Sequence, residues 1–474
     1  MIKLLIAREL LDYSRNGQFR ILLVVVLVLT GVASLDGWNR AREAAQARAA
    51  AEVNDHHVWV EQGANSPHGA AHFARYAFRP TPALAAFEPG SFDYAGAAVW
   101  MEAHYQNPAT LRRAEDTLAR APLPALSAGW VLRVVGSLAL LVLLFPAVAR
   151  ERESGTIRSI AATGVTGGAF VAGKVTAAVA TALVFTVIAV VVSLLPAAFI
   201  GVDVIEPPRV VALIAVHAVG LTAFGLLAVA VSAMCRTSGA ALVGGAALWL
   251  AWIVGVPTIG AQLSTTLHPD INERAFKSSL QLEAQTAFWK GEAKGPAVAA
   301  YEETIAKEHG ATDFDELGFN REAMELQAHE EFANQVYDRL YGEMSATYQA
   351  QDRVLRGATV VSPLLALQRV SAGIAGTDLL AQQAFTAQAE QHRRRIIALL
   401  NRDMMLNAGN DGFAYMAGRE LWEQTADFQG QPPGLAEVVG RYWVELASLL
   451  GWLVLAVAVA VGRTRRAMQV EVLT

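Results

Sequence analysis

The sequence has little of what a disulfide-stabilised, a nucleic-acid-binding or a disordered protein needs. One cysteine in 474 residues excludes an internal disulfide framework. Lys and Arg number 38 against 43 Asp and Glu, so there is no basic excess to meet nucleic-acid phosphates. Charged residues make up 17% of the chain, against about 25% in soluble domains. With 54% hydrophobic residues, the composition predicts membrane spans together with a substantial aqueous portion.

Long hydrophobic runs are what the sequence has instead. A spanning helix needs about 20 mostly apolar residues, and six runs meet or approach this length. They cover approximately residues 19–35, 129–149, 175–200, 210–234, 239–259 and 442–462. We therefore expect a mainly α-helical polytopic membrane protein with six transmembrane helices. The first run has a cleaved signal peptide as its alternative interpretation, but no clear A-x-A cleavage site follows it.

Basic residues in the short loops orient these spans. They precede the first run, follow the second, separate the fourth from the fifth and follow the sixth: Lys3, Arg8, Arg15, Arg20, Arg150, Arg152, Arg158, Arg236, Arg463, Arg465 and Arg466. The positive-inside rule makes this the cytoplasmic face, with both termini on it. Residues 1–15 place charged and apolar side chains on different arcs, which predicts an amphipathic interfacial helix. A plain cytoplasmic extension of the first span is the alternative.

Two long loops then lie on the opposite, extracytoplasmic side. Residues 38–128 begin with an Ala-rich helical stretch and continue with turn signals and aromatics, which predicts a small mixed module. Residues 262–440 are mostly helical by pattern, with a stripe repeating every four residues from Phe332 to Tyr348 and a second from Phe385 to Met404. The pair Ser362-Pro363 separates the two stripes. We expect both loops to form one extracytoplasmic domain.

The remaining organisation follows from these boundaries. The expected regions are 1–37 (interfacial helix and first span), 38–128, 129–261 (spans two to five), 262–440, and 441–474 (sixth span and cytoplasmic tail). Within 129–261, residues 150–174 form a charged short helix followed by a Gly-rich return to the membrane. This shape suits a docking element, and an ordinary solvated loop is the alternative.

The interfacial helix, the six spans and the stretch RERESGTIRSI…GK resemble the permease subunits of ABC-2-type transporters. The resemblance covers residues 1–37, 129–260 and the last span. It implies that residues 150–174 carry a coupling helix that contacts an ATP-binding cassette subunit. The positions that match are Glu151, Glu153, Gly155, Thr156 and Lys174. Segments such as SPHGAAHFARYAFRP, WMEAHYQN and SPLLALQRVSAGIAGTD resemble a bacterial branch with large periplasmic insertions.

The resemblance implies a permease in the bacterial inner membrane that exports or extracts its substrate. ATP and magnesium are expected on the separate subunit, with no intrinsic cofactor and no catalytic residues in this chain. Expected partners are that subunit, a second identical or related permease chain, membrane lipid and a periplasmic protein, but no nucleic acid. Two alternatives stay open: a mechanotransmitting subunit without a substrate path, and a periplasmic metal-binding or enzymatic module anchored by the spans.

One stretch nearly matches a phosphate-binding loop. Gly168, Gly173 and Lys174 fit the first part of G-x4-GK-[ST], but Val175 stands where magnesium binding needs Ser or Thr. No strand precedes the glycines, and Lys174 opens a predicted membrane helix. We therefore expect no nucleotide site here.

The first long loop holds five of the ten histidines, including His68, His72 and His104. His68 and His72 are spaced i, i+4, which on a helix presents two imidazoles to zinc or copper. Gly69 follows His68 where a zincin needs glutamate, so peptidase chemistry is not predicted. The alternative is structural or surface histidines packed beside aromatics.

Arg133, His217 and Glu445 are titratable residues inside predicted spans. Arg133 and Glu445 lie at similar depth near the outer ends of the second and sixth spans, and we expect them to pair or to line an outer vestibule. Independent snorkelling to the interface is the alternative. His217 lies further inside the fourth span, either as a structural polar contact or as a proton carrier. Glycines of the fifth span predict close helix packing, within the chain or with a second permease.

Overall fold

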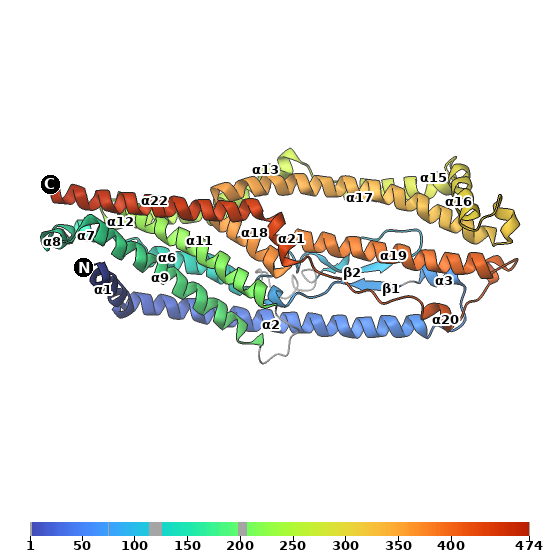
Figure 1. The fold of residues 1–474 in the computed structure, drawn as a ribbon, viewed down its shortest axis with the longest axis horizontal. Helices are drawn as coiled ribbons and strands as arrows, with labels where there is room; N and C mark the ends of the chain where they lie inside the picture. Colours follow the sequence, from blue (N-terminus) through green and yellow to red (C-terminus); the bar gives the residue numbers. More distant parts are fainter. Residues whose placement is uncertain (1, 74, 113–125, 198–205, 474) are drawn as a thin grey trace.

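The computed structural model describes residues 2–73, 75–112, 126–197 and 206–473. The molecule is an elongated, almost entirely helical assembly with both termini at the same end (Figure 1). A bundle of membrane-type helices occupies the half that carries the termini, and the two long insertions extend from its other end. Termini that share an end agree with an even number of spans.

Six helical segments in the described part of the chain are long and apolar enough to cross a membrane, which confirms the predicted fold class. They are α2 (Gly17–Val60), Ala128–Glu153 (α5, a π-helical turn, α6 and α7), α9 (Gly167–Leu194), α11 (Pro207–Met234), Ser238–Leu267 (α12, a π-helical turn and α13), and α22 (Trp443–Leu473). The π-helical turns cover Val131–Gly136 and Ala251–Gly255.

Helix α11 is the centre of the bundle. It packs against α22, α9, α6 (Ser137–Leu144) and α18 (Pro363–Ala375), and most of its side chains are buried. Its apolar residues, from Leu213 to Ala233, belong to one continuous core that also contains the buried faces of the neighbouring helices. If any neighbouring helix moves, its side chains must therefore pack differently against α11.

The N-terminal helix α1 (Ile2–Arg15) is separate from the first span, because Asn16 caps the start of α2. The Asn16 side chain accepts a hydrogen bond from the Gln18 N–H at 2.9 Å, which satisfies one free donor of the new helix. Helix α1 lies along α9, where Gly173 lets its backbone approach closely.

Several spans differ from their predicted bounds, and two of these differences change the organisation of the chain. The first span does not end near Leu35 but continues as the same helix through the Ala-rich stretch to Val60, since nothing between the two interrupts helical hydrogen bonding. The third span begins at Gly167, with Thr166 as its N-cap, rather than near Val175. The predicted Gly-rich return is therefore mostly the first turns of α9, and only Gly164, with φ at +79°, lies in a turn before it.

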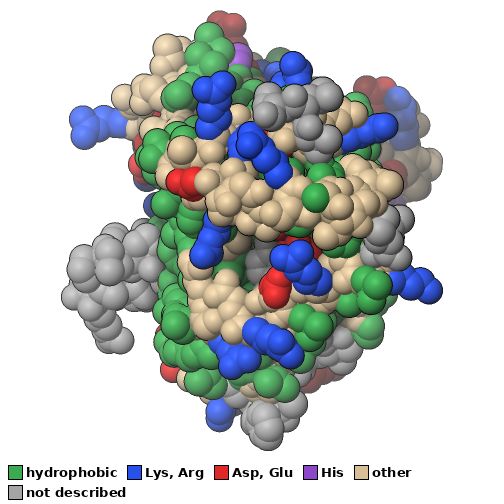
Figure 2. Space-filling model, turned by 90° about the vertical axis from the view of Figure 1, so that its left-hand side faces the viewer, with side chains coloured by type: hydrophobic (Ala, Val, Ile, Leu, Met, Phe, Trp, Pro, Cys, Tyr) green, Lys and Arg blue, Asp and Glu red, His purple; other side chains and the backbone are tan. Residues whose placement is uncertain are grey.

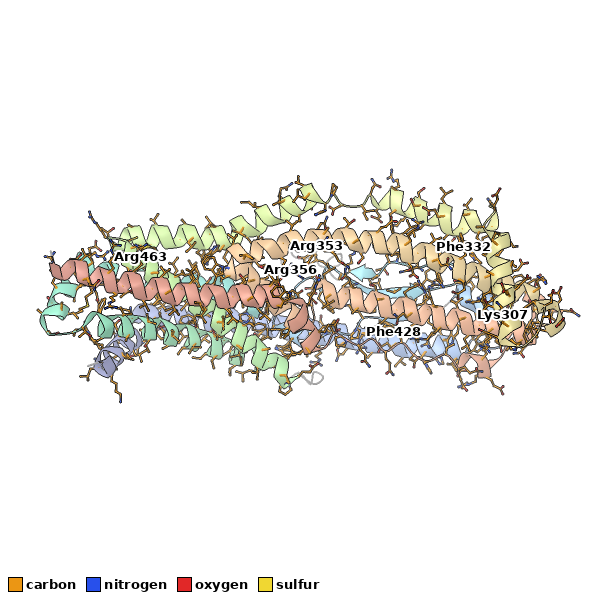
Figure 3. All side chains as sticks on the ribbon, turned by 45° about the horizontal axis from the view of Figure 1, so that its top comes forward. Lys307, Phe332, Arg353, Arg356, Phe428 and Arg463 are labelled. Atoms are coloured by element: carbon orange, nitrogen blue, oxygen red, sulfur yellow. The ribbon has the colours of Figure 1, made fainter. Side chains whose placement is uncertain are left out.

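The outer part combines a small sheet with long helices. The antiparallel sheet has the order β1 (Arg75–Phe78), β2 (Gly96–Met101) and β3 (Thr110–Arg112), with Arg75 opposite Met101 and Gly96 opposite Arg112. The helices are α3 (Pro67–His72), α14 (Glu273–Leu280), α15 (Ala287–Trp289), α16 (Lys294–Glu308), α17 (Arg321–Val361), α19 (Leu379–Asn407), α20 (Arg419–Trp422) and α21 (Leu435–Arg441). In Figure 3, Lys307 and Phe332 mark the far end, and Arg353 and Arg356 lie midway along the molecule.

Both insertions contribute to one hydrophobic cluster. Trp59 and Met101 from the first insertion pack in it with Phe385, Leu400 and Trp422 from the second. The rings of Trp59 and Trp422 meet edge to face with centroids 5.6 Å apart, and the Trp59 indole N–H donates to the Trp422 carbonyl at 3.1 Å. The two insertions therefore share a core.

The expected helical stripes both lie on long helices, α17 and α19, and Ser362 with Pro363 separates α17 from α18 as predicted. The buried face of α17 is different in detail. Ala333, Tyr337 and Leu340 are buried, whereas Phe332 is half-buried and Tyr348 is exposed. A period of four drifts around a helix of 3.6 residues per turn, so one repeating stripe cannot stay on one face for this length.

Candidate coupling site and histidine cluster

Two short helices cover the end of the bundle that carries the termini. Helix α7 (Ala149–Glu153) is followed by α8 (Thr156–Ala162), and Gly155 joins them in the left-handed region at φ +70°. Ile157 and Ile160 of α8 are buried in the bundle core, whereas Ser159 and Ala162 are exposed. We call α7, Gly155 and α8 the terminal hairpin. Figure 2 shows this end, where Lys and Arg side chains spread over the surface beside a few acidic ones.

Lys174 connects the terminal hairpin to the N-terminal helix. Its Nζ lies 2.9 and 3.0 Å from the two carboxylate oxygens of Glu9 and 2.7 Å from Oε1 of Glu151. The side chain of Lys174 is only 5% exposed, so its charge depends on these two carboxylates. One cation thus holds α1, α7 and α9 together.

Polar contacts also join the hairpin to α11, α12 and α22. Arg152 donates to the backbone carbonyls of Ala233 and Cys235 at the end of α11 and lies 3.4 Å from Glu471 of α22. The Glu153 carboxylate accepts hydrogen bonds from the N–H and the hydroxyl of Ser238 at the start of α12. A force on the hairpin therefore acts on several spans at once.

Ser232 of α11 stabilises the helix break that precedes the hairpin. Pro146 interrupts the second span after α6. The Ser232 hydroxyl donates to the Phe145 carbonyl at 2.6 Å and accepts from the N–H groups of Val148 and Ala149 at 3.0 Å each. The break is thereby fixed to the central helix, and the direction of α7 with it.

The predicted coupling residues separate into distinct roles. Glu151 and Lys174 meet in one ion pair, Glu153 accepts hydrogen bonds from Ser238 at the start of α12, and Gly155 supplies the turn. The Thr156 hydroxyl forms a local hydrogen bond with the Ser154 hydroxyl at 2.6 Å. The near-match to a phosphate loop lies within α9, so its glycines form helix rather than a phosphate-binding loop.

The predicted pair between Arg133 and Glu445 is wrong. Arg133 donates instead to Glu88 at 2.9 Å, and both side chains are 5% exposed. Glu88 belongs to the first insertion, which packs closely enough that a side chain at Gly129 would clash with its carboxylate. Depth along the spans does not identify the partner of Arg133, because Glu88 comes from an insertion that packs against the outer end of the bundle.

Glu445 pairs with residues of the second insertion. Its carboxylate lies 3.1 Å from Arg369 of α18, and Arg369 also contacts Asp352 of α17 at 2.6 Å. Asp352 accepts from Arg441 at 2.9 Å, next to α22. We call Asp352, Arg356, Arg369, Arg441 and Glu445 the junction network, because it joins α17, α18, α21 and α22 where the bundle meets the insertions.

His217 is fully buried in α11 and faces structural partners. Its Nδ1 lies 2.9 Å from the Leu213 carbonyl one turn earlier, and its ring meets Phe87 edge to face at 5.4 Å. A hydrogen bond to its own helix and an aromatic contact with the first insertion favour the structural interpretation over a proton carrier.

Comparison with protein families identifies the membrane part. Residues 4–302 match the family model described as ABC-2 family transporter protein, which is more than half of the chain. The chain belongs to the ABC-2 transporter family. Residues 279–431 of this permease also match a domain of unknown function, DUF3526. No curated protein and no solved structure matches the permease.

The outer part of the permease brings together the three predicted histidines. The ring nitrogens Nε2 of His68 and His72 are 3.2 Å apart, and one nitrogen from each of His68, His72 and His104 lies within 4.8 Å of the others. All three side chains are half-buried. Burial, together with the neighbouring His72 and His104, lowers the pKa of His68 to about 4, so its imidazole is neutral at physiological pH.

Two further residues adjoin this cluster from α17. Glu330 Oε1 accepts from both the backbone N–H and Nδ1 of His104 at 2.7 Å, and Oε2 lies 3.2 Å from Arg393 of α19. Burial raises the pKa of Glu330, but the hydrogen bond from His104 and the charge of Arg393 outweigh it and hold the pKa at about 2. His329 lies beside them, with its Nδ1 3.2 Å from His104 Nδ1.

Several contributing residues were not identified from the sequence. Glu9, Glu88, Asp352, Arg369 and Glu330 each complete a buried ion pair or hydrogen bond described above. The only signal available was a charge among mostly apolar residues, as for Arg369 in α18. Their partners lie far away in sequence, which no local pattern reveals.

Proposed function

We propose that this permease is the membrane subunit of an ATP-driven exporter and is coupled to a separate ATP-binding cassette subunit through residues 150–174. In this proposal the termini and the terminal hairpin are cytoplasmic, the two insertions are periplasmic, and the bacterial inner membrane surrounds the bundle. ATP and magnesium belong to the partner subunit, and this chain supplies no hydrolytic residue.

The observation that carries the proposal is that helix α8 of the terminal hairpin has one exposed face and one face buried in the bundle. Ser159 and Ala162 form an exposed face, while Ile157 and Ile160 on the other side of α8 enter the bundle core. A partner that docks on the exposed face therefore bears directly on the packed spans, as a coupling element requires.

The contacts around the hairpin suggest how a push would spread. Lys174 transmits it to α1 and α9, Arg152 to the ends of α11 and α22, and Glu153 to the start of α12. Because α11 is buried among the other helices, a tilt of the hairpin must change the packing of the whole bundle.

A second permease chain fits the exposure of the fifth span. In the apolar 18-residue stretch of Ser238–Leu267, only 17% of the residues are buried, against 61% in the corresponding stretch of α11. Gly239 and Gly255 face open space, whereas Gly245 packs tightly on Leu141 of the second span. The fifth span thus uses some of its glycines, such as Gly245, for packing within the chain and leaves others, such as Gly255, on a face available to lipid or to a second chain.

The proposal is tested by blocking the exposed face of α8. We expect Ala162→Trp to abolish co-purification of an ATP-binding subunit from native membranes. We also expect it to abolish the ATPase activity of the complex in nanodiscs. Ala299→Trp is the matched control, because Ala299 is an exposed alanine on α16 at the other end of the molecule. Equal loss of the ATP-binding subunit in both variants, or no loss in either, would contradict the proposal.

A mechanotransmitting subunit is the second candidate, favoured by the continuity between bundle and insertions. Helix α2 runs from the bundle into the outer part without a break, and the junction network fixes α17 and α18 to α22. Nucleotide-driven movement of α16, measured by pulsed electron paramagnetic resonance, would occur in both candidates. Cysteines introduced into the bundle would distinguish the two candidates by their reactivity with small thiol reagents. Cysteines that stay unreactive in every nucleotide state would favour the transmitter. Cysteines that become reactive in one nucleotide state would favour export.

A further inference from the structure

We propose that His68, His72 and His104 bind one transition-metal ion of the zinc and copper class, with Glu330 orienting His104. The residues belong to the outer part of the permease, far from the terminal hairpin, so the proposal does not depend on the coupling function.

The spacing of the imidazoles fits a metal centre. With metal–nitrogen distances of about 2.0–2.1 Å, two ligands of a tetrahedral zinc ion lie about 3.3 Å apart. The Nε2 atoms of His68 and His72 are separated by 3.2 Å. The ring centroids of His104 lie 5.5 and 5.1 Å from those of His68 and His72, so the third imidazole closes the same space.

The backbone that carries the ligands is held in place. His68 and His72 lie one turn apart on α3, which is fixed by the fully buried Ala70 and Ala71. His104 has φ at +67°, a left-handed conformation that is unfavourable for a non-glycine residue. Hydrogen bonds compensate: its N–H donates to Glu330, and its carbonyl accepts from Gln285 and Tyr337.

Glu330 acts on the site through His104 rather than as a ligand. Oε1 accepts from the backbone N–H and Nδ1 of His104, and Oε2 pairs with Arg393, which is 1% exposed. Both carboxylate oxygens are therefore engaged. A carboxylate on one ring nitrogen fixes the tautomer and turns the other nitrogen, here Nε2, toward a metal.

A competing set of donors shares His104. His104, His329 and Glu330 also bring three ligand atoms within 4.8 Å of one another. The oxygens of Glu330 are already bonded, however, and the His329 ring is packed between Phe288 and Trp289 at 4.6 and 4.8 Å. The half-buried trio of His68, His72 and His104 is the more accessible set, so we assign the metal there.

The donor chemistry selects the kind of ion. Neutral imidazoles suit zinc, copper, nickel and iron, whereas magnesium and calcium require oxygen ligands. Three histidines also leave a fourth tetrahedral position open to water or to an exogenous group. Zinc is the reference probe, cobalt(II) is its spectroscopic substitute, and magnesium is the negative probe.

The binding test uses the purified full chain in nanodiscs. We expect one zinc ion per chain after dialysis, measured by inductively coupled plasma mass spectrometry, and no magnesium. His68→Ala with His72→Ala should abolish binding, and Glu330→Gln should weaken it by roughly 10–100-fold. The control is His57→Ala with His309→Ala, which removes two exposed histidines from the same part of the molecule and should leave binding unchanged.

A measurement on the unsubstituted protein covers variants that fail to fold. Zinc should protect His68, His72 and His104 from diethyl pyrocarbonate, followed by peptide mass spectrometry, while His57 and His309 stay reactive. Cobalt(II) should give the visible bands of a tetrahedral nitrogen site, which zinc removes. Three outcomes would overturn the proposal: an adventitious ion only, with equal loss in test and control variants; no stoichiometric zinc; or no selective protection.

Discussion

The terminal hairpin and the junction network both bury charged side chains, but they do so differently. At the hairpin, one cation, Lys174, serves two carboxylates from different helices. At the junction, the single carboxylate of Asp352 contacts three arginines, Arg356, Arg369 and Arg441. A single shared cation can be displaced by one local change, whereas an acidic residue held by several cations keeps its position when one contact is lost.

This difference suits the two places. The hairpin lies where the proposed ATP-binding subunit docks, so a connection that rearranges is useful there. The junction lies where the bundle meets the insertions, and Glu445 is fully buried within it. Multiple contacts would keep α17, α18 and α22 aligned with one another if the bundle moves, as the proposed function requires.

Removal of the shared cation should have the largest effect. In Lys174→Met, Glu9 and Glu151 face each other without compensation, and breaking such a buried pair typically costs about 3–5 kcal/mol. We expect faster hydrogen exchange in α1, a lower thermal midpoint and loss of coupled ATPase activity. Lys3→Met is the control, since Lys3 is exposed on α1. Unchanged protection of α1 in Lys174→Met would show that Lys174 does not hold it.

Charge reversal tests the connection between bundle and insertions. Arg133→Glu and Glu88→Arg should each destabilise the protein by about 3–5 kcal/mol, because each leaves two like charges in a buried site. The double swap should recover much of the thermal midpoint. A swap of Arg133 with Glu445 should recover nothing, since the structure gives these residues different partners. The reverse pattern of rescue would restore the pairing expected from sequence.

The helix break before the hairpin should respond more moderately. Ser232→Ala removes one hydroxyl that donates to Phe145 and accepts from Val148 and Ala149. Leaving such buried backbone groups unsatisfied costs about 1–3 kcal/mol. We expect a lower thermal midpoint and weaker ATPase stimulation, with Ser154→Ala, an exposed serine of the hairpin, close to wild type.

The smallest effect is expected at two glycines that should respond in opposite directions. Gly155→Ala places a side chain at φ +70° and should cost about 1–2 kcal/mol. Gly168→Ala lies in α9 with no atom near its new methyl group, and should stabilise the helix by up to about 1 kcal/mol. Thermal unfolding of both variants checks the sign. A stabilising Gly155→Ala would mean that the hairpin turn does not need a left-handed residue.

Features that depend on residues close together in the sequence could be predicted from it. Apolar runs of about 20 residues identify spans because lipid leaves few alternatives, and Ser362-Pro363 marks a helix boundary because proline ends a helix locally. The spacing of His68 and His72 likewise predicted a shared face, which α3 provides.

Long-range pairings were not accessible in the same way. Arg133 and Glu88 are separated by 45 residues, and Lys174 and Glu9 by 165. Depth along the spans suggested Glu445 as the partner of Arg133, but the choice was made by the path of the insertions, which carry Glu88 and Arg369 to the outer end of the bundle. Sequence alone therefore predicted which charges are unusual and not which ones meet.

The most direct test of the coupling account is a photo-crosslinking amino acid at Ser159, on the exposed face of α8. We predict that irradiation of native membranes links this position to an ATP-binding cassette subunit, and that the same group at Ala299 on α16 does not. If the photo-crosslinking group never captures an ATP-binding subunit, and a cysteine in Ser159→Cys reacts only with thiol reagents applied from outside intact cells, the proposed orientation and the coupling role of the terminal hairpin are both wrong.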